Sequence, residues 1–100
     1  MKDVFERLNK VFENHFRLKI MSLLMVNEAV DFLSLKSGLN ISDGNLASHI
    51  TKLEEAGYLT IQKTFAGKKT QTSYSTTPEG KKAFEEHLSA LEEIIHGMGS

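Results

Sequence analysis

The sequence contains no cysteine, and its single proline is Pro78. Without cysteine the chain cannot form disulfides, use a thiolate in catalysis or bind a metal through sulfur, so its stability must come from packing or from association with a second chain. No run approaches the roughly 18 apolar residues that a membrane-spanning helix needs. From Lys2 onward charged and apolar residues alternate, without the apolar centre of a signal peptide. We therefore expect a cytoplasmic protein with no membrane segment.

The chain has 100 residues, of which 40% are hydrophobic and 25% are charged, as in an ordinary globular protein. This length suits one domain, residues 1–100, with a single core. The net charge of −1 argues against a nucleic-acid partner, since phosphate contacts need an excess of lysine and arginine. The charge is uneven, however: residues 63–82 hold five lysines and one glutamate, and residues 83–100 hold four glutamates and no lysine or arginine. A basic patch can bind phosphate while the acidic end lies away from it.

The segment from Ser42 to Gly57 has the clearest local pattern in the chain. Leu46, Ile50 and Leu53 recur at the spacing that lines one side of an α-helix, and that side is expected to face the core. Ser42 stands at the N-cap position, and Gly57 supplies the left-handed residue that often ends a helix. The other side carries short neutral or basic groups able to exchange hydrogen bonds with a polar partner: Gly44, Asn45, Ser48, Thr51 and Lys52, with His49 at the edge.

Residues 31–37 predict a brief helix in front of this one, with Phe32, Leu33 and Leu35 available for burial. Residues 38–41 begin with a glycine and predict the tight connection between the two helices. Helix, short glycine-containing turn and helix is the arrangement of the helix-turn-helix motif, here over about residues 31–57. The same spacing also fits an ordinary helical hairpin with no nucleic-acid role.

Two helices are predicted before this motif, over residues 3–12 and from residue 16 to about Val26, with a break or cap at Asn14 or His15. One bent helix would give a similar pattern. Residues 29–30 predict a very short strand.

The hydrophobic period changes after residue 57. Residues 58–65 alternate apolar and polar side chains, a turn follows, and residues 71–76 return, which predicts a two-stranded hairpin over about residues 58–76. Such a hairpin is marginal alone and must pack against the helices. Its expected anchors are Leu59 and Ile61 on one face, with Tyr74 opposite them.

Thr77, Pro78 and Glu79 predict the start of a long final helix that runs to about Ile95. Its apolar residues recur in a heptad pattern that is typical of packing against a partner helix: Phe84, Leu88, Leu91, Ile95 and Met98. Together with the helix predicted over residues 3–12, this helix is expected to form a twofold dimer interface. Packing within one chain is the alternative. The interface residues expected are Phe5, Leu8, Phe12, Phe84, Leu88, Leu91 and Ile95.

The order of these elements covers nearly all of the chain and resembles the winged-helix DNA-binding domains of the MarR and ArsR families of prokaryotic transcriptional regulators. The resemblance is greatest to the short MarR-like group. It rests on residues 15–24, 42–59 and 74–80, and its most specific part is the Ser48-His49 pair ahead of Leu-Glu-Glu-Ala-Gly-Tyr. It implies a mainly helical α+β fold, a winged helix-turn-helix with N-terminal helices, a two-stranded wing and a long C-terminal helix.

The resemblance further implies that residues 42–56 form a recognition helix for the DNA major groove and that the hairpin is a wing reaching phosphates or the minor groove. The DNA-binding residues expected are Ser42, Gly44, Asn45, Ser48, His49, Thr51, Lys52, Lys63, Lys68 and Lys69. The wing has lysines where similar proteins often have arginines, so its tip is expected to position the duplex rather than read bases. His49 either donates to a phosphate or packs half-buried beside Leu53.

The function expected is therefore sequence-specific binding of double-stranded DNA, as a homodimeric repressor of transcription on a pseudo-palindromic site, without a cofactor. An apolar cleft between the dimer helices and the hairpin would admit a small-molecule effector, although a packed core would use the same residues. The alternative function is a winged-helix protein–protein interaction module, which the net charge of −1 favours. The polar face of the helix over residues 42–57 argues against it, since protein interfaces usually centre on apolar anchors.

An enzyme is not expected. Ser48 and His49 are adjacent on a helix and point in different directions, and the sequence has neither a paired-carboxylate pocket nor a glycine-rich phosphate loop. Glu92 and His96, with His87 upstream, have a spacing compatible with zinc. A solvated acidic helix face explains the same residues, so no metal site is expected.

Overall fold

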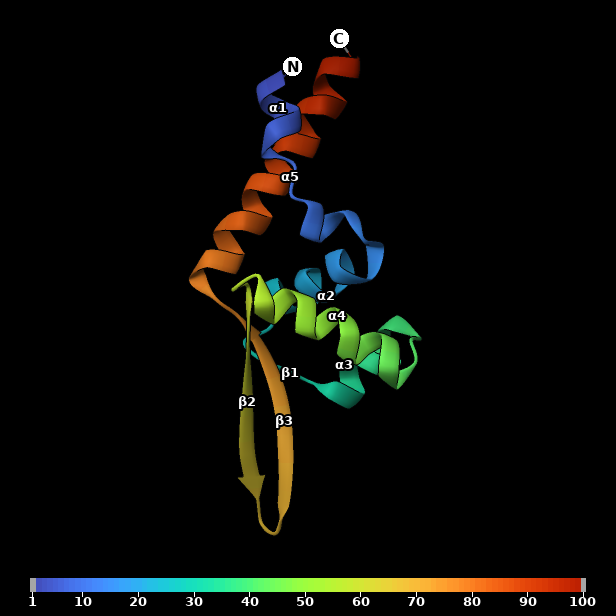
Figure 1. Ribbon diagram of the computed structural model, residues 1–100, viewed down its shortest axis with the longest axis vertical. Coiled ribbons are helices and arrows are strands. Elements are labelled where there is room, and N and C mark those ends of the chain that lie inside the picture. The colour runs from blue at the N-terminus through green and yellow to red at the C-terminus, as the bar shows by residue number, and fades with distance from the viewer. Residues whose placement is uncertain (1, 100) are drawn as a thin grey trace.

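The computed structural model describes residues 2–99. Helices make up most of this part of the chain, and a β-hairpin precedes the last helix (Figure 1). The elements are α1 (Lys2–Arg7), the 3₁₀ helix η1 (Lys10–Glu13), α2 (His15–Val26), β1 (Val30–Asp31), α3 (Phe32–Leu39), α4 (Asp43–Glu55), β2 (Leu59–Ala66), β3 (Lys69–Thr76) and α5 (Pro78–Gly99). The molecule is elongated, at 57 × 26 × 21 Å. The wing projects at one end of the long axis, and α1 lies beside the far half of α5 at the other. None of the helices in the described residues has the length and apolarity needed to cross a bilayer.

This architecture is the expected winged helix-turn-helix, mainly helical with a hairpin wing and a long last helix. The predicted N-caps are confirmed. Asn14 starts α2, Ser42 starts α4 and Thr77 starts α5, each accepting a backbone N–H of the following turn at 2.9, 3.3 and 2.8 Å respectively. Gly57 ends α4 with φ = +83°, as its sequence position predicts.

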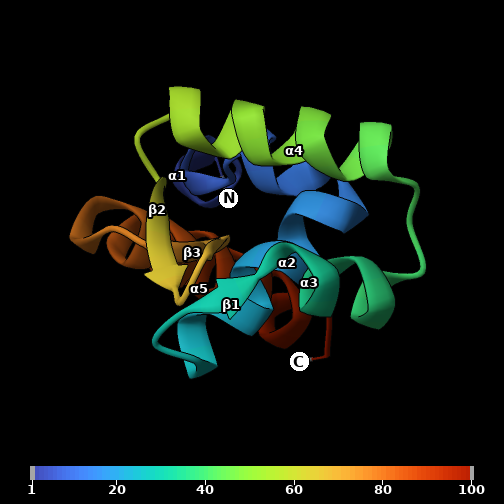
Figure 2. The same ribbon diagram turned by 90° about the horizontal axis from the view of Figure 1, so that it is seen from below.

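The core fills the space between α2, α3, α4, the base of the sheet and the first half of α5. Leu46, Ile50 and Leu53 are all buried in it, which confirms the inward side predicted for α4. The other members of the buried cluster are Phe12, Ile20, Met21, Leu24, Leu35, Ile41, Leu59, Tyr74 and Phe84. The core therefore fixes α4 from below and leaves its outer side uncovered, as Figure 2 shows.

The helix predicted over residues 3–12 is wrong in its second half. α1 ends at Arg7, and Asn9 starts the separate 3₁₀ helix η1 as its N-cap. The Oδ1 of Asn9 accepts the backbone N–H of Val11 at 3.0 Å. The η1 turn directs Phe12 inward, where it is 1% exposed and packs edge-to-face on Phe84 at 5.2 Å. Phe12 and Phe84 are therefore unavailable to a second chain, and both are removed from the expected dimer interface.

The connection inside the helix-turn-helix also differs from the prediction. Gly38 is part of α3, and the turn is made instead by Asn40, which has φ = +51°. Asparagine tolerates the left-handed region better than most residues, so the glycine is not needed there. Leu33, which was expected to be available for burial, is 73% exposed.

The sheet has three strands in the order β1-β3-β2, and the predicted two-stranded wing is its β2–β3 hairpin. The very short strand predicted at residues 29–30 is present as β1, where Val30 pairs with Tyr74. Ile61 lies across from Tyr74 on β2 but is 38% exposed, so it is a weaker anchor than Leu59, which is 2% exposed. The hairpin extends past the body from that point, with Phe32 and Leu33 at the start of α3 beside residues 70–72 of β3.

His87 is a buried histidine that joins α5 to the junction between α1 and η1. It is 3% exposed, its Nδ1 accepts the backbone N–H of Asn9 at 2.9 Å, and its ring lies 5.5 Å from that of Phe12. Because a backbone N–H can only donate, Nδ1 must be unprotonated here. Burial holds the pKa of His87 below its ordinary value of 6.5, and the nearby Glu13 carboxylate opposes that shift.

Acid is expected to destabilise the protein through His87. The unfolded imidazole takes up its proton near its ordinary pKa, whereas the folded one does so only at lower pH. Unfolding therefore binds a proton between the two values, and stability is lost as the pH falls below about 6.5. The free energy of unfolding of His87→Gln, which keeps a neutral acceptor, is expected to fall less between pH 7 and pH 5 than that of the wild type. His96→Gln, at an exposed site, is the control; an equal fall in His87→Gln would contradict this assignment.

Candidate nucleic-acid interface

The outer side of α4 is a polar ridge. At 100° per residue, Gly44, Ser48 and Thr51 lie opposite the buried leucines, with Asn45 and Lys52 on the flank nearest α2. All five of these residues are exposed, and Figure 2 shows no other element over this side of the helix. Apart from Lys52 the side chains are short, so the helix backbone can approach a surface closely.

Part of the hydrogen-bonding capacity of Thr51 is used within α4. Its hydroxyl donates to the carbonyl of Ala47 at 2.9 Å, which leaves the oxygen lone pairs and the methyl group to face outward. A threonine methyl can contact the methyl group of thymine in a major groove. Asn45 carries an amide, which has the donor and acceptor needed to pair with an adenine edge.

An ion pair links the start of α4 to α3. Lys36 Nζ lies 2.7 Å from Asp43 Oδ1, which joins the two helices of the motif across the turn. Both side chains are well exposed, so the pair is worth little in stability. It does offset the negative charge of Asp43 at the end of α4 that carries Gly44 and Asn45, where that charge would otherwise repel a phosphate.

His49 is half-buried, with Arg17 and Phe16 of α2 beside it. Arg17 Nη1 lies 3.1 Å from His49 Nδ1, and the ring of Phe16 lies 5.6 Å from the imidazole. Because a guanidinium can only donate, Nδ1 accepts and the ring proton is on Nε2. Burial lowers the pKa of His49 below its ordinary value, and the charges of Arg17, Lys52 and His15 lower it further. The residue is thus a neutral donor at pH 7.

Arg17 is a residue that the sequence analysis did not include in the site. Its Nε donates to the carbonyl of Val11 at 2.7 Å while its guanidinium holds His49, so its position is fixed by two elements. A shallow hollow of about 270 Å³ beside α4 is lined by Lys10, Val11, Arg17, Lys52 and Glu55. One signal pointed to Arg17: a cation in the first turn of a helix opposes the helix dipole and so favours a role outside the helix.

The wing places its lysines along the hairpin and at its tip. Lys63 is on β2 opposite Thr72, and Lys69 begins β3 opposite residue 66. The two-residue loop is Gly67 and Lys68, and Gly67 has φ = +68°, the conformation required at the first loop position of a type II′ turn. All three lysines are exposed. The structure thus separates the expected DNA-binding residues into two groups, one on α4 and one on the wing.

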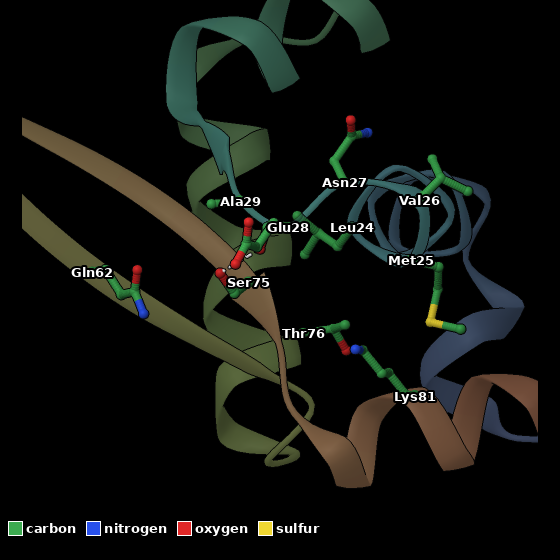
Figure 3. Close-up of a pocket in the computed structure, with 10 residues that line it drawn as sticks. All are labelled: Leu24, Met25, Val26, Asn27, Glu28, Ala29, Gln62, Ser75, Thr76 and Lys81. Carbon is green, nitrogen blue, oxygen red and sulfur yellow. Dashed lines mark hydrogen bonds between the residues drawn. The ribbon is translucent and has the colours of Figure 1, made fainter.

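A cleft of about 840 Å³ lies between the end of α2, the base of the hairpin and the first turn of α5 (Figure 3). Within it Ser75 Oγ donates to the carbonyl of Glu28 at 2.9 Å, and Lys81 points toward Thr76. The cleft expected from the sequence was apolar and lay between the dimer helices and the hairpin. This one includes the end of α2 and is lined by both polar and apolar side chains: Leu24, Met25, Val26, Asn27, Glu28, Ala29, Gln62, Ser75, Thr76 and Lys81.

The expected dimer residues that remain accessible lie on α1, at Leu8 just after it, and on α5. Phe5 is 55% exposed, Leu88 43% and Ile95 68%, while Leu8 and Leu91 are half-buried. Arg7 and Glu93 form an ion pair that holds α1 against α5. The side chain of Met98, the last member of the heptad pattern, lies outside the part of the chain that the structure describes.

The three residues considered for a metal do not converge. His96 Nε2 and Glu92 Oε1 are 3.5 Å apart on the exposed side of α5, whereas His87 is buried beneath Asn9. Among residues 2–99, no group of three or more potential ligands is arranged to hold a metal ion.

Comparison with known proteins agrees with this geometry. Residues 16–95 match the family model of the winged helix DNA-binding domain. The uncharacterized protein MJ0432 of Methanocaldococcus jannaschii is 37% identical over 79 residues, which is 79% of this chain and 86% of that protein. The solved structure of a transcriptional regulator homologue from Pyrococcus horikoshii OT3 is 29% identical, with a TM-score of 0.89 and 98% coverage of both chains.

A MarR-family regulator from Enterococcus faecalis V583 shares the fold at 21% identity and a TM-score of 0.73, over 89% of this chain and 79% of that one. The resemblance seen in the sequence is therefore confirmed, and the structural neighbours are MarR-like transcriptional regulators. These are DNA-binding proteins rather than enzymes. From the family match over most of its length, this chain belongs to the winged helix DNA-binding domain family.

Proposed function

We propose that this protein is a repressor of transcription that acts in the cytoplasm, binding a pseudo-palindromic DNA site as a homodimer. One α4 enters the major groove of each half-site, and the wing contacts the backbone beside it. The observation that carries the proposal is the uncovered polar ridge of Gly44, Ser48 and Thr51, flanked by Asn45 and Lys52, on a helix whose other side is locked into the core.

The chemistry of each side chain indicates whether it contacts bases or phosphates. Asn45, Ser48 and Thr51 have the short polar groups that read base edges, and Gly44 and Ser42 allow close approach to the groove. Lys52, Lys63, Lys68 and Lys69 contact phosphates and supply the salt-dependent part of the affinity. His49 donates from Nε2 to a phosphate oxygen, because Arg17 fixes the tautomer that leaves this nitrogen protonated.

Dimerisation uses the exposed apolar side chains Phe5 of α1 and Leu88 and Ile95 of α5 at its centre, with the half-buried Leu8 and Leu91 at its edge. A twofold pair would present two α4 helices to half-sites about one helical turn, 34–36 Å, apart. We also propose that a small-molecule effector binds in the cleft shown in Figure 3. There it would contact both α2 and the base of the wing and so bias their relative position.

The test is fluorescence anisotropy with the DNA directly upstream of the chain's own gene, compared with a scrambled duplex, at about 50 and 200 mM salt. Tighter binding to the upstream DNA, weakening with salt, is expected. Asn45→Ala is expected to weaken binding to the preferred duplex by about 1–3 kcal/mol and to leave scrambled DNA unaffected. Lys68→Ala is expected to weaken both equally and to reduce the salt slope by about 1.

Lys82→Ala is the matched control, since it removes one exposed lysine from α5 rather than from the wing. It is expected to leave both duplexes bound as before. Equal binding of the two duplexes with no dependence on salt would exclude the regulator, and pull-down of protein partners would then test the interaction-module alternative.

A further inference from the structure

Phe65 is the most exposed aromatic side chain described for the wing, at 80%. It lies on the same face of the hairpin as Leu59, Ile61 and Lys63, because alternate residues of a strand share a face. Along this face the exposure of the apolar side chains rises from 2% at Leu59 to 38% at Ile61 and then to 80% at Phe65. Six residues of strand carry Phe65 about 20 Å beyond Leu59, past the reach of the core.

The surroundings of Phe65 are cationic. Lys63 precedes it on the same face, Lys68 is in the loop, and Lys69 starts the returning strand; all three are exposed. Opposite Phe65 on β3 is Thr70, a small side chain that leaves the ring uncovered. An isolated apolar side chain on a surface is common and needs no explanation by itself. An exposed aromatic ring near the tip of a projecting hairpin, with three lysines close to it in the hairpin, favours a binding role.

The positive charge around the ring identifies its partner. A protein interface would surround an aromatic anchor with further apolar groups and would deplete lysine, whereas the lysines here match a polyanion. The face that carries Phe65 is also the one that packs on the helices at its base, through Leu59 and Tyr74. Phe65 thus shares a face of the hairpin with residues that pack on the helical body, but it lies at the exposed end of that face, near the tip of the wing.

We propose that Phe65 acts as an apolar wedge, entering the minor groove next to the half-site, partly unstacking one base step and so bending the DNA. The proposal rests on the DNA-binding function given above. Proteins that bind the minor groove often combine basic side chains with such a wedge, which kinks the duplex by about 20–90°. The lysines of the wing hold the flanking phosphates while the ring enters, and α4 reads the major groove independently of the ring.

The wedge is tested on a duplex of about 30 base pairs, long enough for two half-sites and their flanks, selected by the wild-type protein from a random pool. Energy transfer between dyes at the two ends reports bending, and 2-aminopurine placed in the flanking steps reports unstacking. With the wild type, both signals are expected to increase on binding. Phe65→Ala is expected to abolish both increases while weakening binding by no more than about tenfold, since the contact energy of the ring is largely offset by the cost of unstacking.

Two variants serve as controls. Phe65→Leu keeps an apolar wedge and is expected to retain most of both signals. Thr64→Ala changes the neighbouring exposed residue on the opposite face of β2 and is expected to behave as the wild type. Because both positions are exposed, melting temperatures are expected to stay the same in every variant.

The outcomes separate the two proposals. Wild-type protein that binds the selected duplex without changing either signal, or Phe65→Ala that still produces both signals, overturns the wedge and leaves the repressor proposal standing. A wild type that selects no duplex from the pool overturns both. Loss of both signals in Phe65→Ala alone, with binding retained, supports the wedge.

Discussion

Gly80→Ala is expected to destabilise the protein by about 3 kcal/mol, at the upper end of what overpacking costs. A Cβ at this position would lie 2.3 Å from the carbonyl oxygen of Tyr58 and 2.9 Å from its Cα. It would also lie 2.6 Å from Oγ1 of Thr76, which could rotate away, but the backbone of Tyr58 could not. Relief requires α5 to move from the start of β2. A change of this size lowers the melting temperature of a domain of this length by roughly 10–25 °C.

The backbone that Gly80 touches is held from several directions. The carbonyl of Tyr58 accepts from Thr76 Oγ1 at 3.0 Å and from the N–H of Thr77 at 3.1 Å, and the N–H of Tyr58 donates to Leu53 at 3.0 Å. Thr77 Oγ1 further donates to Gly57 at 2.7 Å. These bonds join the end of α4, the start of β2, the end of β3 and the start of α5 at one point, so a displacement there also moves α4 relative to the wing.

Gly38→Ala is the matched control, because Gly38 is also helical and a Cβ there meets nothing within 4 Å. That substitution is expected to stabilise the protein by about 0.5–1 kcal/mol, since alanine loses less conformational freedom in a helix. Thermal and urea denaturation of the two variants give the comparison. If Gly80→Ala proved as stable as the wild type, α5 would not be tightly seated on Tyr58, and the junction would not fix the angle of the wing.

Much of this fold could be predicted because its signals are local. The ends of α4 are set by Ser42 and Gly57, and the start of α5 by Thr77, all within a few residues of the element they bound. The inward side of α4 follows from the spacing of its leucines and isoleucine. Such features depend on capping and periodicity, which a sequence displays directly.

Most of the errors concern contacts between distant residues; the turn made by Asn40 rather than Gly38 is a local exception. The end of α1 is set by Asn9, whose backbone binds His87, 78 positions away. The heptad spacing identifies apolar side chains on α5 but does not distinguish one that meets Phe12 of its own chain from one that meets another chain. Phe84 meets Phe12 of its own chain, whereas Leu88 is exposed and accessible to another chain. The pairing of Arg17 with His49 was missed for the same reason, since 32 positions separate the two residues in the sequence.

Leu88→Glu is expected to convert a dimer into a monomer and to weaken binding to DNA with two half-sites by about 10²–10⁴-fold. Leu88 and Ile95 lie on one flank of the buried stripe of α5, so a twofold interface centred on them would bury Leu88 from both chains. Two carboxylates would then be desolvated close together without a partner. Once the dimer separates, the second half-site is no longer held at a high effective concentration, which accounts for the size of the loss.

The same variant is expected to bind a duplex with a single half-site as tightly as the wild type, because α4 and the wing are unchanged. Ser89→Glu adds the same charge one residue away, on the side of α5 opposite the core, and is expected to leave both the dimer and the affinity intact. Sedimentation velocity at micromolar concentration gives the oligomeric state, and anisotropy gives the two affinities. A dimer that survives Leu88→Glu would move the interface away from this flank of α5, whereas a wild type that sediments as a monomer would leave each α4 to bind its half-site alone.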